Sequence, residues 1–199
     1  MNGFYKFFRA ILWIFFGPFH PIKTYGSEHI PEGGALICGN HTSLCDPILV
    51  AFAFRKKSVL RVMAKAELLH VPILGYFLKK AGIFGVDRGK SDIGAIKQAM
   101  KYLKGGDKVL LFPEGTRIKD GAESEAKTGA AMLAVRTGVP IVPVWMPAKK
   151  RWFSRTPVVI GEPYYPKTAD KRATPEEYHE IADDLMARIF ALEALSHEN

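Results

Sequence analysis

A histidine and an aspartate five positions apart, His41 and Asp46, are the residues of this chain best suited to acid–base chemistry. Imidazole titrates at about pH 6.5, so a neutral histidine can accept a proton at cellular pH. A carboxylate bonded to its other ring nitrogen would fix the tautomer and stabilise the imidazolium that forms. The pair is therefore a candidate general base with its orienting acid. Spacing alone leaves an alternative open, in which Asp46 only caps a helix that begins at Pro47.

Two arginines in glycine-rich surroundings form a candidate anion site. Arg88 follows the short apolar run 83–86, and Arg117 ends the sequence Phe-Pro-Glu-Gly-Thr-Arg at 112–117. A guanidinium fork matches phosphate bidentately, and neighbouring glycines let the backbone approach a ligand closely. The alternative for each arginine is an ion pair with a local carboxylate.

Three other chemistries fit the residues around the turn less well. The spacing of four potential ligands matches no common zinc pattern: Cys38, His41, Cys45 and Asp46. Ser43 or Cys45 could be a nucleophile, but the chain has no Gly-x-Ser-x-Gly elbow. The stretch 85–91 resembles a phosphate loop but has three residues between its glycines, where that motif needs four.

Short apolar runs alternate along the chain with stretches whose apolar residues have helical spacing. These two patterns predict the strands and helices that carry the candidate site residues. Strands are expected at 21–26, 35–39, 58–63, 83–86, 108–112, 139–146 and 157–160, and helices at 47–54, 73–81, 92–103, 128–137 and 175–195. This alternation predicts a single α/β domain with a mixed, largely parallel sheet flanked by helices. Since open α/β sheets place their sites outside the carboxyl ends of the strands, strand 35–39 would deliver His41 to such an edge.

The first twenty residues are strongly aromatic and carry only Lys6 and Arg9 as charges. Their apolar run, 10–16, is shorter than the ~20 residues that a membrane-spanning helix needs. The composition favours residues 1–20 as an amphipathic helix in the membrane interface, followed by a domain at 21–199. The alternative is a helix packed on the protein's own body.

The net charge of +8 and the pI of about 9.5 indicate an anionic partner. Nucleic-acid binding is compatible with this charge, but the chain has no recognisable nucleic-acid motif. The stretch 149–153 mixes cations with aromatics and could contact lipid headgroups, or it could be a solvated loop. Two cysteines do not support a disulfide framework and favour a reducing, cytoplasmic location.

Four blocks of sequence, in order, resemble the glycerolipid acyltransferases, specifically the 1-acylglycerol-3-phosphate acyltransferases. The blocks are Asn-His-x-Ser-x-x-Asp at 40–46, the set Gly82, Phe84 and Arg88, Phe-Pro-Glu-Gly-Thr-Arg at 112–117, and Val-Pro-Ile-Val-Pro-Val at 139–144. Lys65 and Lys127 resemble further basic positions of the family. The resemblance covers about residues 22–165.

The resemblance implies transfer of a fatty acyl group from acyl-CoA or acyl-ACP to the free hydroxyl of 1-acyl-glycerol-3-phosphate, giving phosphatidic acid. It assigns catalysis to His41 and Asp46, makes Ser43 and Cys45 bystanders, and requires neither a metal nor a cofactor beyond the thioester co-substrate. The substrate-binding residues that it implies are Lys65, Arg88, Glu114, Gly115, Thr116, Arg117 and Lys127.

The expected partners are a lysophospholipid, an acyl thioester and an anionic membrane surface, with an acyl carrier protein as a candidate and nucleic acid excluded. The expected location is the cytoplasmic face of the cell membrane, peripheral or monotopic. Two alternatives stay open. The acceptor could be another lysolipid, such as a lyso-ornithine lipid or lyso-cardiolipin, or the chain could be a non-catalytic basic module that binds membranes.

Overall fold

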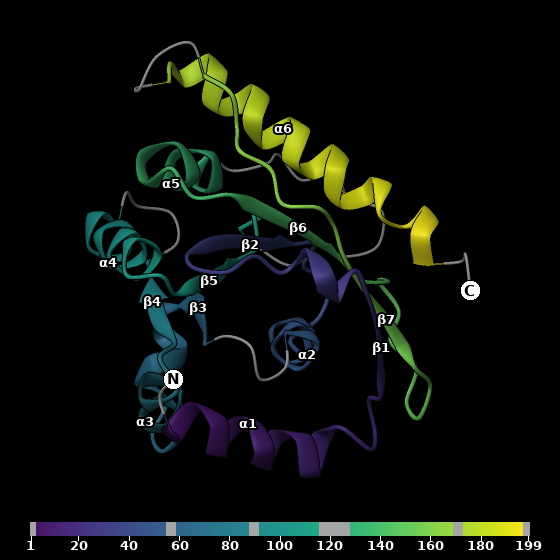
Figure 1. Ribbon diagram of the computed structural model, residues 1–199. Coiled ribbons are helices and arrows are strands. Elements are labelled where there is room, and N and C mark those ends of the chain that lie inside the picture. The colour runs from purple at the N-terminus through teal and green to yellow at the C-terminus, as the bar shows by residue number, and fades with distance from the viewer. Residues whose placement is uncertain (1–2, 55–58, 88–91, 116–127, 169–172, 197–199) are drawn as a thin grey trace.

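A seven-stranded sheet lies between two layers of helices in the computed structural model, which describes residues 3–54, 59–87, 92–115, 128–168 and 173–196 (Figure 1). The strands are β1 (Ile22–Tyr25), β2 (Ala35–Gly39), β3 (Leu60–Lys65), β4 (Phe84–Val86), β5 (Lys108–Leu111), β6 (Ile141–Trp145) and β7 (Thr156–Ile160). The helices are α1 (Gly3–Phe16), α2 (Asp46–Ala53), α3 (Leu74–Lys80), α4 (Ile93–Lys104), α5 (Gly129–Thr137) and α6 (Pro175–Ala191).

The strand order is β1-β7-β6-β2-β5-β3-β4. Strands β6, β2, β5, β3 and β4 run parallel, whereas β7 pairs antiparallel with β6 and parallel with β1. The prediction of a mixed, largely parallel sheet flanked by helices is therefore confirmed. Because five strands share one direction, their carboxyl ends lie along the same edge of the sheet.

Strand β2 lies in the middle of the sheet and is buried along its whole length. Successive side chains of a strand face opposite sides, so both sides of β2 need a cover. Ala35 and Ile37 belong to a core with residues of α1 and α2, and Leu36 and Cys38 to a core with residues of α4, α5 and α6. Figure 1 shows these helix layers, with α1, α2 and α3 below the sheet and α4, α5 and α6 above it.

Each expected strand and helix exists, but several predicted ends were wrong. Strand β3 begins two residues later than expected and makes Lys65 its last residue, while β6 begins only at Ile141, after Pro140. Helix α6 ends at Ala191 and is followed by a short 3-10 turn at Ala194–Ser196. The residues at which a strand or helix begins and ends depend on local capping and strand pairing, which apolar periodicity does not report.

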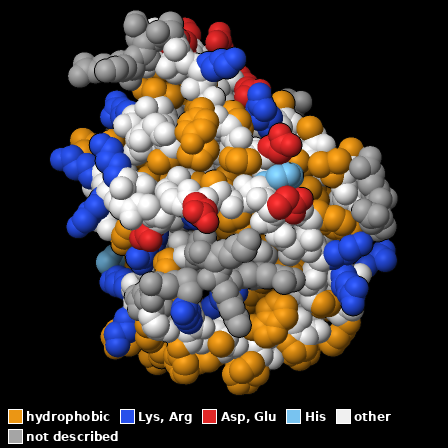
Figure 2. Space-filling view, viewed as in Figure 1, with side chains coloured by type: hydrophobic (Ala, Val, Ile, Leu, Met, Phe, Trp, Pro, Cys, Tyr) orange, Lys and Arg blue, Asp and Glu red, His pale blue; other side chains and the backbone are white. Residues whose placement is uncertain are grey.

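Helix α1 uses one face to pack on the domain. Trp13 meets Phe52 of α2 edge-on with ring centroids 4.9 Å apart, and Phe8 stacks on Phe77 of α3 at 6.3 Å. Its other face leaves Ile14 and Phe15 65% and 73% exposed. Figure 2 shows hydrophobic side chains gathered along the lower edge of the molecule, over this helix. Packing on the protein's own body is therefore right for one face, and the opposite face is an uncovered apolar surface.

The length and composition of the helices bear on how the protein can meet a membrane. Among the described residues, no helix combines the length and the apolar character needed to cross a bilayer.

Candidate active site

Strand register brings three turns together at the carboxyl edge of the sheet. Strand β2 lies between β5 and β6, with Cys38 opposite Leu111 and Gly39 opposite Val144. The segments that follow these three strands, beginning at residues 40, 112 and 146, therefore start side by side. This edge is where parallel sheets usually place their sites.

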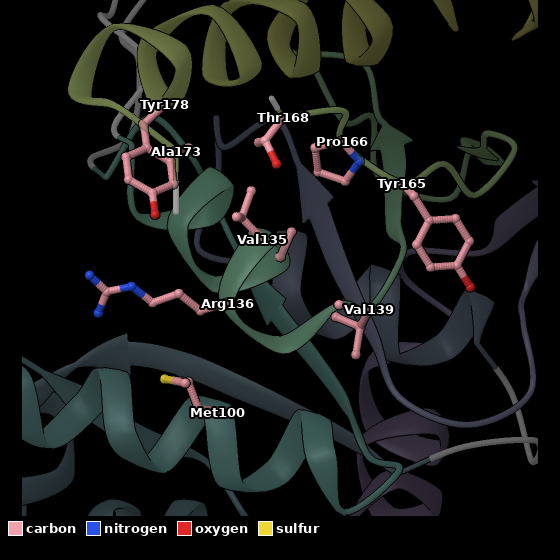
Figure 3. A pocket seen from close by; sticks show the side chains of 11 residues that line it. Met100, Val135, Arg136, Val139, Tyr165, Pro166, Thr168, Ala173 and Tyr178 are labelled. Carbon is pink, nitrogen blue, oxygen red and sulfur yellow. The ribbon is translucent and has the colours of Figure 1, made fainter. Parts of the chain in front are cut away.

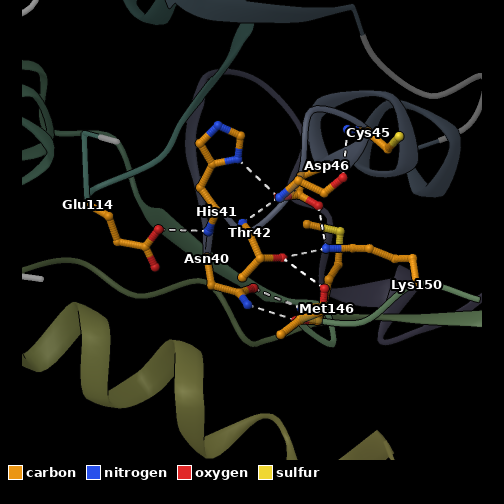
Figure 4. A network of polar contacts seen from close by, with 10 residues as sticks. Asn40, His41, Thr42, Cys45, Asp46, Glu114, Met146 and Lys150 are labelled. Carbon is orange, nitrogen blue, oxygen red and sulfur yellow. Dashed lines mark hydrogen bonds and ion pairs between the residues drawn. The ribbon is translucent and has the colours of Figure 1, made fainter. Parts of the chain in front are cut away.

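Asn40 fastens the first of these turns to the end of β6. Its side-chain amide donates to the carbonyl of Met146 at 2.7 Å, and the Met146 N–H donates back to Asn40 Oδ1 at 2.9 Å. Both residues are buried, so neither bond competes with water. This two-way contact fixes the backbone from which His41 projects (Figure 4).

His41 and Asp46 form the expected pair. His41 Nδ1 lies 3.0 Å from Asp46 Oδ2, and the Asp46 side chain is fully buried. The same oxygen accepts the backbone N–H groups of Thr42 and Ser43, each at 2.7 Å. A carboxylate acceptor requires the proton on Nδ1, which leaves Nε2 as the basic nitrogen.

The capping alternative for Asp46 is wrong. Cys45 occupies the cap position of α2 and makes no side-chain capping bond, and Asp46 is the first residue of the helix itself. Its carboxylate folds back over the turn instead. Burial by itself raises the pKa of Asp46, but the bond from His41, the Lys150 cation and the Ser43 N–H together hold it below its usual value.

Phe112 supports the imidazole from one side. Its ring stacks on His41 with centroids 4.1 Å apart and planes tilted by 18°. Such a contact restricts rotation of the imidazole and keeps water from that face. Sequence reasoning missed this role, although Phe112 is the first residue of the third family block.

Glu114 reaches the same histidine through the backbone. It is only 2% exposed, and its Oε2 accepts the N–H of His41 at 2.8 Å. Oε1 is buried and has no hydrogen-bond partner within the described residues. Burial raises the pKa of Glu114 to about 7, with the bond from the His41 N–H opposing and the Asp46 charge adding to the rise. Glu114 can therefore carry a proton near neutral pH.

Lys150 is a member of the site that sequence reasoning missed. Its ammonium lies 2.5 Å from Asp46 Oδ1 and 2.6 Å from the Thr42 hydroxyl, and its side chain is 5% exposed. The headgroup hypothesis for 149–153 is therefore wrong for Lys150. Lys149 and Arg151 are exposed, as are the two aromatics that follow, and a headgroup contact by them stays a prediction. Three consecutive cations give no local signal for which one turns in.

The other predicted residues fall into two groups. Gly115 forms a turn beside Glu114, with φ of +68° and its N–H bonded to Phe112 O at 3.0 Å. Lys65 ends β3 on the same edge, half exposed and paired with Glu67 at 2.8 Å. Four residues lie outside the described part of the chain: Arg88, Thr116, Arg117 and Lys127.

A separate hollow lies at the other edge of the sheet (Figure 3). It measures about 720 Å³ and is lined by residues of α4 and α5 and by Gly138 and Val139, which precede β6. None of the predicted site residues borders it. The candidate site residues that the structure describes therefore lie at the carboxyl edge, away from this hollow.

The family model described as "Acyltransferase" matches residues 21–147. A 1-acyl-sn-glycerol-3-phosphate acyltransferase of Bacillus subtilis is 30% identical over 95% of this chain and 96% of its own length. A chloroplastic 1-acyl-sn-glycerol-3-phosphate acyltransferase of Arabidopsis thaliana is 34% identical over 69% of the chain. The matched part is 39% of that plant protein and 41% and 43% of those of Brassica napus and Cocos nucifera, so several relatives are much longer than this chain.

A solved structure shares the fold. The chain superimposes on the 1-acyl-sn-glycerophosphate acyltransferase PlsC of Thermotoga maritima with a TM-score of 0.68 and 29% identity. The match covers 98% of this chain and 79% of the other. The sheet and its helical layers are thus those of a solved enzyme.

Proposed function

The chain belongs to the Acyltransferase family, and we propose that it acylates 1-acyl-glycerol-3-phosphate to phosphatidic acid. The donor is an acyl thioester, either acyl-CoA or acyl-ACP. The acceptor oxygen attacks the thioester carbonyl, the new C–O ester bond forms, and the C–S bond breaks to release a thiol. Overall, the proton of the acceptor hydroxyl ends on the departing sulfur.

The observation that carries this proposal is the buried pair of His41 and Asp46. An alcohol is a weak nucleophile until its proton leaves, and a positioned base accelerates such a step by roughly 10²- to 10⁴-fold. His41 Nε2 takes that proton, while Asp46 orients the ring and balances the imidazolium. The imidazolium then protonates the leaving thiolate, so no acyl-enzyme is needed at Ser43 or Cys45.

We assign the glycerol phosphate to the turns beyond β4 and β5, with Arg88, Thr116, Arg117 and Lys127 as its ligands. Strand β5 neighbours β2, whereas β4 lies three strands away, about 14 Å at the usual strand spacing. The turn at Gly115 therefore leads from the immediate neighbourhood of His41. Lys65, at the end of β3, and Glu114 complete the proposed binding set.

The exposed face of α1 is the proposed contact with the membrane that holds both substrates. Phe7, Ile14 and Phe15 are 60%, 65% and 73% exposed on a helix that is otherwise packed. A second aromatic group continues this surface, because Phe19 follows α1 and packs on Trp152 and Phe153 at ring distances of 6.0 and 5.5 Å. Peripheral attachment follows from this contact, and we propose the cytoplasmic face of the membrane as its place.

The direct test offers purified protein 1-acyl-glycerol-3-phosphate in vesicles with acyl-CoA or acyl-ACP and measures phosphatidic acid. We expect product with at least one donor, and loss of about 10³-fold or more in His41→Ala. Full activity in His41→Ala would contradict the proposal. Parallel assays with lyso-ornithine lipid and lyso-cardiolipin decide whether the acceptor has been assigned correctly.

Membrane contact has its own test. Phe15→Glu should weaken co-sedimentation with anionic vesicles, because it places a charge in the apolar face. Phe190→Glu is the matched control, since Phe190 is 46% exposed on α6, on the other side of the sheet. Equal binding by the two variants would refute α1 as the contact surface.

A further inference from the structure

The segment between β6 and β7 is mostly solvent-exposed, but one of its side chains turns inward. Residues 151–155 are all exposed, as is Lys149. The Lys150 side chain is 5% exposed, and its ammonium ends against the Asn40–Asp46 turn. An ammonium loses several kcal/mol of hydration on burial, and a charge partner is needed to offset that loss. Its place in the site therefore requires an electrostatic explanation.

The contacts of Lys150 join it to the catalytic pair rather than to the sheet. Asp46 Oδ2 is occupied by His41 and two backbone N–H groups. Within the described residues, the polar contact of Asp46 Oδ1 is the ammonium of Lys150, at 2.5 Å. The ammonium also donates to Thr42 Oγ1 at 2.6 Å, which ties both ends of the turn to one cation. One carboxylate oxygen of Asp46 thus accepts hydrogen bonds from the turn, and the other pairs with the Lys150 cation.

The charges of Asp46 and Lys150 bear on the protonation state in which His41 begins the reaction. An unbalanced carboxylate beside an imidazole strengthens its hold on a proton, and a protonated histidine cannot act as a base. The Lys150 cation offsets part of that effect while leaving the hydrogen bond in place, so that Asp46 can still stabilise the imidazolium once it forms. Glu114 is the other described ionisable group that contacts the His41 turn, and its contact is with the backbone.

We propose that Lys150 is a positioning residue for acyl transfer: its buried ammonium fixes the Asp46 carboxylate and balances its charge, so that His41 begins as a neutral base. The inference rests on the proposed function, because the proton that His41 accepts is that of the acceptor hydroxyl. Lys150 acts through Asp46 and does not touch the substrate.

The first experiment measures the pH dependence of kcat and KM in Lys150→Met and Lys150→Gln. We expect the acid limb of kcat to move to higher pH by about one unit in both, since a nearby cation has been removed. KM should change by less than about 2-fold, because no substrate contact is lost. Lys150→Gln keeps a hydrogen-bond donor and tests the charge alone if Lys150→Met folds poorly. Lys150→Arg should bring the acid limb back towards wild type.

Lys108→Met is the matched control. Lys108 is also buried, at 4% exposure, but its ammonium donates to Gly33 O at 3.0 Å, before β2 and at the other edge of the sheet. We expect the acid limb of kcat in Lys108→Met to stay at the wild-type pH. A shift as large as that in Lys150→Met would overturn the proposal, because any buried lysine would then have the same effect.

The second experiment does not depend on turnover. NMR titration of labelled histidine, with His41→Ala for assignment, should give a higher His41 pKa in Lys150→Met than in wild type. If the wild-type protein transferred no acyl group, the proposed function would fail while this titration still tested the role of Lys150. An unchanged His41 titration in a folded variant, or an effect on KM alone, would refute the proposal.

Discussion

Two turns meet at His41, the one that contains it and the one that follows β5. Each supplies one buried carboxyl group, and the two groups have opposite electrostatic surroundings. Asp46, in the Asn40–Asp46 turn, has a cation and three hydrogen-bond donors around it. Glu114, in the Phe112–Gly115 turn, has one backbone N–H on Oε2 and an unpaired Oε1 among the described residues. Asp46 is therefore held ionised, whereas the pKa of Glu114 rises to about 7.

This difference shows that burial does not by itself decide the state of an acid. Both side chains are almost fully enclosed, at 0% and 2% exposure. Burial pushes both pKa values upward, and only the partners of Asp46 reverse the shift. Asp46 can thus serve as the permanent anion of the proposed catalytic pair. The other can gain or lose a proton at neutral pH, with one oxygen free for a ligand.

The largest expected difference between the two turns is in turnover. Asp46→Asn should lower kcat by roughly 10²- to 10⁴-fold, because the amide no longer enforces the tautomer with its proton on Nδ1. Glu114→Gln should lower kcat far less and raise KM instead, since the proposed role of Glu114 is to bind substrate. Steady-state kinetics at pH 6 and pH 8 check both. Similar losses of kcat in the two variants would remove the distinction between the turns.

The next effect concerns stability against pH. A carboxyl whose folded pKa is raised favours the folded state least when it is ionised, so Glu114 lowers stability as pH rises from about 4.5 to about 7. Glu114→Gln should therefore gain on wild type by about 2–3 kcal/mol across that window. Urea unfolding at pH 5, 6 and 7 measures this difference.

Asp46 gives the opposite sign in the same experiment. Its folded pKa is lowered, so its stabilising contribution is present above its ordinary value and is lost as pH falls through the folded value. Asp46→Asn should consequently lose stability relative to wild type at neutral pH and less so in acid.

A constant difference in unfolding free energy between Glu114→Gln and wild type from pH 5 to pH 7 would contradict the account of Glu114.

The smallest effect is expected from the aromatic contact of the second turn. Phe112→Leu removes the ring that stacks on His41 at 4.1 Å, and a contact of this kind contributes about 1 kcal/mol, or about 5-fold in kcat. Phe54→Leu is a suitable control, because Phe54 is buried at the end of α2 and, among the described residues, has no ring stack with His41. If both variants lose the same kcat at equal stability, the Phe112 stack has no special role.

The sequence by itself determined the elements and the proposed catalytic pair. The alternation of apolar runs with helical periodicity predicted the α/β sheet, since burial of a strand or a helix face depends on spacing along a few residues. His41 and Asp46 lie in one short turn, so their meeting needs little more than local geometry. The four blocks, resembling a known family, supplied the reaction that we propose. The aromatic first segment predicted an apolar surface, although not the face with which α1 packs.

Only the tertiary structure decided what surrounds that pair. Glu114 contacts His41 across 73 positions of sequence, and Asn40 contacts Met146 across 106. These contacts exist because β5 and β6 are the neighbours of β2, an order that no local pattern encodes. The choice of Lys150 over Lys149 and Arg151 depends on the same packing. Short-range spacing fixes which groups can react, and strand order fixes which charges they meet.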